Sequence, residues 1–227
     1  MRRVLALCLI AAAAVVAAPA IASGGDNAQL DLQLVSPIEP LTFEALFEDG
    51  TCVDGDFDAL IEANGNEVTP ISVTQSPEDP DLFVIVLPSN TEPGELSADI
   101  ECDNGDGNTA AQSDVDWASM PVTKVVSGPA PADATFTVHL DCVEGSPADA
   151  AELPENFAVD LHYGVAGGVK YAYTDHGVLC TVTEPVNGGA TSVAITPQII
   201  DSTPDPGVYP ATVTNTFAAA IQPNFTG

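Results

Sequence analysis

Cysteine is the residue type whose number and spacing first indicate chemistry in this chain. Four of the five cysteines lie beyond an apolar N-terminal segment and fall into two pairs, Cys52 with Cys102 and Cys142 with Cys180. In an oxidising compartment, thiols at such spacings form disulfides. Short alternating segments surround each pair, and Pro, Gly, Asn and Asp separate them, which is typical of a disulfide-pinned β-sandwich. Crossed pairing between the halves would require both sandwiches to open.

The alternation also predicts which way the second pair of cysteines points. Cys142 shares a strand face with Val138 and Leu140, and Cys180 shares one with Val182, because successive strand residues point to opposite faces. We therefore expect Cys142 and Cys180 to meet in a core and to bridge its two sheets. In the chain-entropy model such a bridge stabilises the fold by roughly 3–4 kcal/mol.

Closely spaced carboxylates form a second set with chemical potential. Two short segments rich in Asp and Gly offer the oxygen ligands that calcium prefers, and the candidate ligands are Asp54, Asp56, Asp58, Asp103 and Asp106. Neither segment has the full twelve-residue calcium loop or its terminal glutamate. Asp, Asn and Gly also dominate ordinary turns, so a weak calcium site and plain structural turns both fit the pattern. No other cofactor is indicated.

Other residue types give no catalytic or metal-binding pattern. His139, His162 and His176 do not stand at a metal-ligand spacing with one another or with a cysteine. No serine lies in a Gly-x-Ser-x-Gly turn, and no glycine-rich phosphate loop opens a helix. Aromatic residues, which sugar-binding clefts use as platforms, make up 6% of the chain. We therefore expect a protein that is not an enzyme.

The N-terminal segment predicts export. Arg2 and Arg3 precede an apolar run over residues 4–17, and small residues lead to Ala22, so residues 1–22 read as a signal peptide. The bulky Leu7 before Cys8 argues against lipid attachment at that cysteine. We expect a secreted, soluble, extracellular protein that is associated with the cell surface only where a partner retains it. It is not expected to be an integral membrane protein.

The charge of the chain is strongly negative. The sequence carries 33 acidic residues and a formal charge of −29, and once the leader is removed only Lys124 and Lys170 remain as basic side chains. Nucleic-acid binding is excluded because phosphate contact needs cationic side chains. Acidity of this kind keeps a protein soluble, in a medium whose salt or divalent ions screen the self-repulsion. The expected partner is an extracellular protein or a component of the cell envelope.

The alternating segments predict two tandem immunoglobulin-like β-sandwiches, over residues 23–119 and 120–227. Expected strands of the first are 29–35, 41–47, 57–63, 68–74, 82–87 and 95–102; those of the second are 122–126, 135–143, 157–163, 169–173, 179–184, 192–195 and 209–217. The polar, Gly-rich segment 103–114 is expected to be a loop. The short junction at 115–121 predicts a semi-rigid tandem.

Four short motifs in the second half resemble a known module. They are Val122-Thr-Lys-Val-Val-Ser-Gly128, Phe136-Thr-Val-His-Leu-Asp-Cys142, Cys180-Thr-Val-Thr-Glu184 and Val213-Thr-Asn-Thr-Phe217. In this order they resemble a repeat module of actinobacterial surface proteins, similar to the collagen-adhesin B-type (Cna-B) and pilin-backbone domains. The resemblance covers about residues 120–218. Unlike surface-anchored relatives, the chain shows no C-terminal sorting signal.

This resemblance implies one covalent reaction. In pilin-type domains a lysine on the first strand can join an asparagine on the last, assisted by an acidic residue, and Lys124, Asn215 and Glu184 stand at the matching positions. Strand phase agrees, since each of the three alternates with core residues. Buried together, the amine would become nucleophilic and the carboxyl would polarise the amide. The alternative is that Lys124 extends to solvent while Glu184-Pro185 begins a turn.

The function expected from these features is a structural or adhesive one. Two immunoglobulin-like modules would act at the cell surface or as a secreted protein. The alternative is a soluble ligand-binding or inhibitory module, which would use loops at one end of a sandwich. An exposed aromatic patch would favour that alternative, and Tyr163, Tyr171 and Tyr173 are its candidates, although Tyr171 and Tyr173 also suit core packing.

Overall fold

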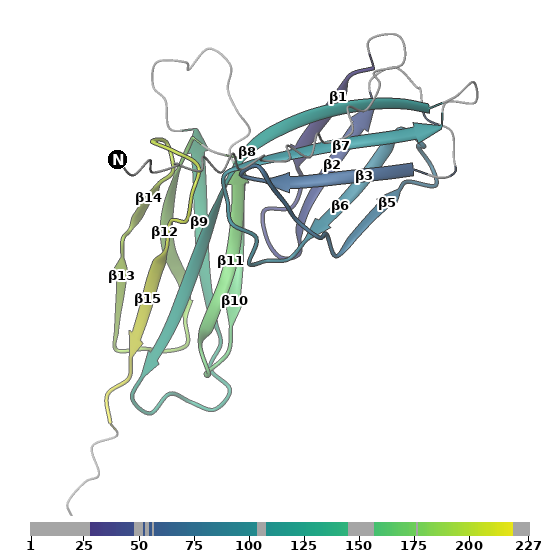
Figure 1. The fold of residues 1–227 in the computed structure, drawn as a ribbon. Coiled ribbons are helices and arrows are strands. Elements are labelled where there is room, and N and C mark those ends of the chain that lie inside the picture. The colour runs from purple at the N-terminus through teal and green to yellow at the C-terminus, as the bar shows by residue number, and fades with distance from the viewer. Residues whose placement is uncertain are drawn as a thin grey trace, which may run out of the picture.

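The computed structural model describes residues 28–47, 52, 55, 57–103, 108–144, 157–175 and 177–219. This part of the chain is all-β (Figure 1). The strands are β1 Leu30–Leu34, β2 Leu41–Phe47, β3 Phe57–Ala63, β4 Asn66–Glu67, β5 Ser72–Gln75, β6 Leu82–Leu87, β7 Glu95–Asp103, β8 Asn108–Ser127, β9 Phe136–Glu144, β10 Phe157–Tyr163, β11 Gly168–Asp175, β12 Val178–Asn187, β13 Ser192–Thr196, β14 Ile199–Asp201 and β15 Ala211–Thr216. None of the described residues forms a helix able to cross a membrane.

The strands build two immunoglobulin-like sandwiches, as the alternation predicts. In the first, the sheet β1-β2-β6-β5 packs against β8-β7-β3-β4, and in the second, β10-β9-β12-β14 packs against β13-β15-β8-β11. Each encloses its own apolar cluster, because every second residue of these strands is apolar and points inward. Phe43, Phe83 and Ile100 are fully buried in the first cluster, and Phe136 and Leu140 in the second.

Strand β8 belongs to both sandwiches (Figure 1). Its first part pairs with β7 as far as Asp116, and its second part pairs with β11 from Trp117 to Lys124. Val115 and Trp117 pack in the first cluster, whereas Met120 and Val122 pack in the second. Odd and even positions point to opposite faces, so the two sandwiches lie on opposite faces of one continuous strand.

The junction is buried on both sides of β8. Trp117, Ala118, Ser119 and Met120 are each exposed by 4% or less. Tyr173 of β11 packs in the first cluster, edge-on to Trp117 at a centroid distance of 6.0 Å. Backbone bonds add to the contact, since the Tyr173 amide donates to the Pro37 carbonyl. The expected boundary between residues 119 and 120 therefore falls inside a strand, where the buried face changes.

Two predicted segments differ from the structure. The expected loop at 103–114 is wrong over residues 108–114, because β8 starts at Asn108 and pairs there with β7, while residues 104–107 lie outside the described residues. The expected strand 68–74 is shorter in the structure, since residues 68–71 are not in a strand: β4 ends at Glu67 in one sheet and β5 begins at Ser72 in the other. Pro70 lies between the two strands and has no amide hydrogen to donate to a ladder.

Both predicted disulfides are present, but the second does not join the two sheets. Cys142 of β9 and Cys180 of β12 are directly opposed neighbours in one sheet, with Cα atoms 4.0 Å apart. The alternation correctly predicts that both cysteines face the core. It shows on which face of its own strand a residue lies, but not which strand lies beside it. In the first sandwich, Cys52 lies in the connection between β2 and β3, and its disulfide joins that connection to Cys102 of β7.

Candidate functional site

The candidate site lies inside the second sandwich, between its first and last strands. Lys124 is on β8 and Asn215 is on β15, and these two strands run parallel. Lys124 is directly opposite Val213, so Asn215 is two positions further along on the same inward face. Lys124 is 2% exposed and Asn215 is fully buried.

Glu184 enters the site from the facing sheet at a break in the β12–β9 ladder. Thr183 pairs with His139, but the next pair is Val186 with Thr137, so β12 carries one extra residue there. Such a bulge redirects side chains, and Pro185 within it has no amide hydrogen for the ladder. The Glu184 side chain is 1% exposed.

The three side chains contact one another directly. The Lys124 Nζ donates to Glu184 Oε1 at 2.5 Å and also donates to Asn215 Oδ1. Asn215 Nδ2 donates to the same Glu184 Oε1 at 3.2 Å and to the Asn187 carbonyl at 3.0 Å. Glu184 Oε1 therefore lies beside both nitrogen atoms, while Glu184 Oε2 has no hydrogen-bond partner among the described residues.

The surroundings of the lysine favour its neutral form. Burial lowers the pKa of Lys124 below its ordinary value, although the hydrogen bond and the charge of Glu184 act in the opposite direction. The ring of Phe136 lies under the amine, 4.7 Å from Nζ to the centroid. The expected alternative, in which Lys124 extends to solvent, does not hold because its side chain is fully buried.

This arrangement contains the groups needed for amide exchange. It provides a nucleophilic amine, a carboxamide whose oxygen that amine already contacts, and a carboxyl oxygen within reach of both nitrogens. The strand alternation predicted that these three side chains point into one interior, and in the structure they are in contact. The sequence did not indicate the bulge, the Phe136 contact or the Asn187 carbonyl, although Pro185 was a signal for an irregular ladder.

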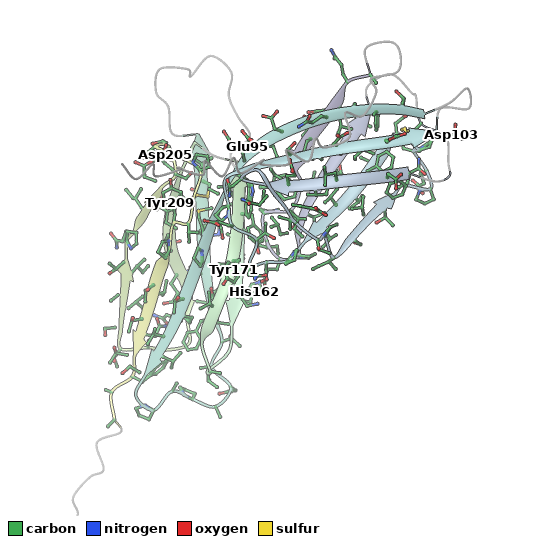
Figure 2. All side chains as sticks on the ribbon, viewed as in Figure 1. Glu95, Asp103, His162, Tyr171, Asp205 and Tyr209 are labelled. Carbon is green, nitrogen blue, oxygen red and sulfur yellow. A yellow bond between two sulfur atoms is a disulfide. The ribbon has the colours of Figure 1, made fainter. Side chains whose placement is uncertain are left out.

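The candidate calcium ligands are only partly described. Asp58 is exposed on β3, and Asp103 is exposed at the end of β7, far from the junction (Figure 2). Asp54, Asp56 and Asp106 lie outside the described residues. Across the described ranges, no group of three or more His, Cys, Asp or Glu is placed to hold a metal ion. Calcium binding at these two segments stays a prediction.

Among the described histidines and tyrosines, His162 and Tyr171 line one cavity of about 190 Å³, together with Asp160 and Lys170. His139 pairs with Asp160 on an outer face at 2.7 Å, His162 is also exposed, and His176 lies outside the described residues. Tyr163 is 5% exposed and Tyr173 is fully buried. Two of the three tyrosines expected for an aromatic patch therefore pack in the interior.

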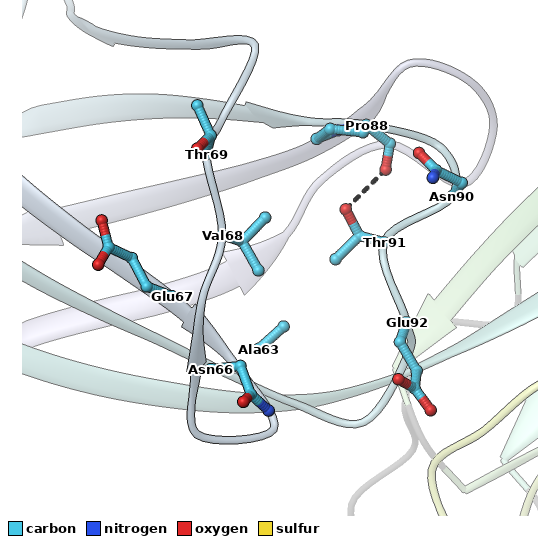
Figure 3. A pocket seen from close by; sticks show the side chains of 9 residues that line it. All are labelled: Ala63, Asn66, Glu67, Val68, Thr69, Pro88, Asn90, Thr91 and Glu92. Atoms are coloured by element: carbon cyan, nitrogen blue, oxygen red, sulfur yellow. Dashed lines mark hydrogen bonds between the residues drawn. The ribbon is translucent and has the colours of Figure 1, made fainter.

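A surface cavity of about 450 Å³ lies at one end of the first sandwich (Figure 3). Ala63, Val68 and Thr91 point toward its centre, and the carboxylates of Glu67 and Glu92 lie at its rim. Thr91 Oγ1 donates to the Pro88 carbonyl at 2.8 Å.

Comparison with known families gives a match over the second sandwich. Residues 120–218 match a family described as a domain of unknown function (DUF5979). The four sequence motifs that resemble a surface-protein module lie in the same range. No curated protein matches the chain.

Among solved structures, the chain is similar to two pilins at low identity. The group B streptococcus pilus 2b backbone protein is 13% identical, with 84% of this chain and 98% of that chain covered and a TM-score of 0.34. The Corynebacterium diphtheriae major pilin SpaA is 10% identical, with 83% and 68% covered and a TM-score of 0.32. TM-scores of this size do not establish a shared fold.

Proposed function

We propose that this chain is a non-enzymatic structural protein of the extracellular or cell-envelope surface, in which an amide bond joins Lys124 to Asn215. The observation that carries the proposal is the buried contact of Lys124, Glu184 and Asn215 between the first and last strands of the second sandwich. Two disulfides and the continuous strand β8 also support a structural role.

The reaction proceeds without an added cofactor. The neutral Lys124 Nζ attacks Asn215 Cγ, and the new Nζ–Cγ bond replaces the Cγ–Nδ2 bond. Glu184 Oε1, beside both nitrogens, receives a proton from Nζ and transfers it to Nδ2, which leaves as ammonia. The product removes an ionisable amine from an interior in which an unpaired charge would be costly.

The position of the bond suits a structural protein. The chain enters the second sandwich along β8 and leaves it along β15, and these strands are parallel neighbours. Tension applied to the two ends of the domain would act along this pair. A covalent bond between Lys124 and Asn215 keeps the two strands together when their hydrogen bonds fail.

Mass spectrometry of the exported protein tests the proposal. After reduction of the disulfides, the intact chain should be lighter than its sequence mass by one ammonia, and peptide mapping should recover the β8 and β15 peptides as one branched species. Asn215→Ala and Glu184→Ala should each restore the full mass, since one lacks the electrophile and the other lacks the proton carrier.

The mapping also excludes a different source of ammonia loss. Succinimide formation at Asn64-Gly65, Asn104-Gly105 or Asn187-Gly188 would give the same change of mass, but it would not join two peptides. Thr214→Ala is the control, because Thr214 neighbours Asn215 on the opposite face of β15. A wild-type protein of full sequence mass, or one without the branched peptide, would contradict the proposal.

A further inference from the structure

A turn with two glycines lies directly against the candidate site of the second sandwich. This 187–190 turn leads from the end of β12 in one sheet toward β13 in the other. The Ala190 amide donates to the Asn187 carbonyl at 3.1 Å, and Gly188 and Gly189 have positive φ angles of 61° and 79°. These are the features of a type I′ turn, whose two central positions favour glycine.

The Asn187 carbonyl holds one side of the Asn215 carboxamide. It accepts a hydrogen bond from Asn215 Nδ2 at 3.0 Å, and Nδ2 is the group that leaves as ammonia in the proposed reaction. A carbonyl oxygen can only accept, so it contacts the nitrogen of the carboxamide and not its oxygen. Asn215 Oδ1 therefore points toward Lys124 Nζ, from which it accepts a hydrogen bond.

Glu184 cannot fix this orientation throughout the reaction. As a carboxylate, its Oε1 accepts from Asn215 Nδ2 at 3.2 Å. In the proposed reaction it then takes up a proton from Lys124, and a protonated carboxyl can donate as well as accept. It could then contact either side of the carboxamide. The Asn187 carbonyl does not titrate, so it favours the same orientation at every stage.

The same turn contacts the aromatic ring that lies under the lysine. A Cβ placed on Gly188 would lie 2.7 Å from Phe136 Cε1 and 3.1 Å from the Cβ of Ala134. The turn can therefore pack against this ring only because residue 188 is glycine. The centroid of the Phe136 ring is 4.7 Å from Lys124 Nζ. The turn thus acts on both reacting side chains, on one through a carbonyl and on the other through the ring.

Hydrogen bonds within and beyond the turn hold it against β15. Asn187 Oδ1 accepts from the Gly189 amide at 3.0 Å, which is an Asx arrangement. The amide and the hydroxyl of Thr191 donate to the Thr216 carbonyl at 2.9 Å and 2.7 Å. Thr216 directly follows Asn215, so the Asn187 carbonyl is held close to the strand that carries the asparagine.

We propose that the 187–190 turn is the positioning element of the reaction between Lys124 and Asn215. The Asn187 carbonyl sets the orientation of the carboxamide, and Gly188 allows Phe136 to lie under the amine. This inference rests on the proposed function. It goes further by assigning a role in the reaction to a turn that would otherwise only connect two strands.

The rate of crosslinking in the newly exported chain tests the proposal. Pulse-labelled protein is collected at intervals, and mass spectrometry measures the share of the branched β8–β15 peptide. Gly188→Ala should slow the reaction about ten- to hundredfold, because a displaced ring or turn misaligns the reacting groups. Asn187→Ala should slow it about three- to tenfold through loss of the Asx hydrogen bond. Asn187→Asp keeps that acceptor and should restore the rate.

Two other glycines provide matched controls. Gly189 and Gly65 have φ angles of 79° and 71°, and in the described part of the chain an added Cβ at either would meet no atom within 4 Å beyond its chain neighbours. Gly189→Ala strains the same turn without touching Phe136, so it should slow the reaction less than Gly188→Ala. Gly65→Ala applies similar strain in the first sandwich and should leave the rate unchanged.

The orientation of the carboxamide can be observed in a chain that does not react. In Glu184→Ala, the Nδ2 protons of Asn215 should give one pair of NMR signals with a contact to the Ala190 amide proton, because both groups donate to the Asn187 carbonyl. Adding Gly188→Ala should weaken this contact or double the signals. Adding Gly65→Ala should change neither.

The outcomes distinguish this inference from the proposed function. A wild-type chain without the branched peptide overturns both. A wild-type chain that crosslinks, while Gly188→Ala and Gly65→Ala react at equal rates, overturns the positioning role alone. The positioning role also fails if Gly188→Ala lowers the unfolding midpoint but crosslinks at the wild-type rate, since the turn would then only stabilise the fold.

Discussion

The two sandwiches share a strand but differ in how each is held together. The first has one disulfide, an outer face rich in carboxylates and no lysine within its described strands. The second has a disulfide between neighbouring strands and a buried lysine. The difference shows that the immunoglobulin-like architecture does not determine where covalent bonds and charges lie. The two sandwiches can therefore differ in function.

The largest expected effect is the loss of the proposed amide. It would close a loop between residues 91 positions apart, which corresponds to about 4–5 kcal/mol in the chain-entropy model of crosslinks. Asn215→Ala should therefore lower the free energy of unfolding of the second sandwich by about that amount. The first sandwich should keep its protection.

Hydrogen exchange followed strand by strand measures this difference. Slow amides of β9, β12 and β15 should become faster in Asn215→Ala, while those of β2, β6 and β7 should not change. Thr214→Ala again serves as the control. Equal acceleration in both sandwiches would mean that β8 couples them into one unfolding unit, and the comparison between two separately held sandwiches would fail.

The two disulfides should differ in their effect. Their loops span 50 and 38 positions, and each would contribute roughly 4 kcal/mol in isolation. The Cys142–Cys180 loop lies within the span of the proposed amide, so its removal should cost less than removal of Cys52–Cys102. Paired Cys→Ala variants in urea unfolding should show this order, and equal losses would count against a second covalent bond in that sandwich.

Sequence periodicity predicted most strands because each buries alternate apolar residues. The strands 41–47, 57–63, 82–87 and 157–163 agree with β2, β3, β6 and β10 at both ends. The same periodicity brought Lys124, Glu184 and Asn215 to one interior. Which residues face the core is a property of each single strand, so the pattern of side chains along that strand predicts it directly.

Properties that depend on two strands were harder to predict. The start of β8 reads as a loop because its inward residues, such as Thr109 and Ala111, are small, while its outward residues are polar. The pattern also could not show that Cys142 and Cys180 are neighbours in one sheet. A change of the buried face from odd to even positions, between Trp117 and Met120, was the available signal for a strand shared by two sandwiches.

The smallest expected effect is a response to acid of opposite sign in the two sandwiches. On the outer face of the first sandwich, burial and then the charge of Glu101 raise the pKa of Asp99 above its ordinary value of 3.8. In the second sandwich, hydrogen bonds from the hydroxyl and the amide of Thr203 lower the pKa of Asp201 below the same value. One aspartate therefore holds its proton more tightly in the native state, and the other less tightly.

The signs follow from linkage between proton binding and folding. A native state that binds more protons than the unfolded chain loses stability as pH rises, so the Asp99 contribution should stabilise the first sandwich as pH falls from neutral toward 4. The Asp201 contribution is present above about pH 4 and should be lost as pH falls through the lowered native pKa.

Asp99→Asn should remove the gain, and Asp201→Asn should remove the loss, since an asparagine oxygen still accepts from Thr203. Carboxylate titration by NMR, with strand-resolved exchange at pH 7, about pH 4 and about pH 3, measures both effects, and a shared direction for the two aspartates would contradict the opposite signs.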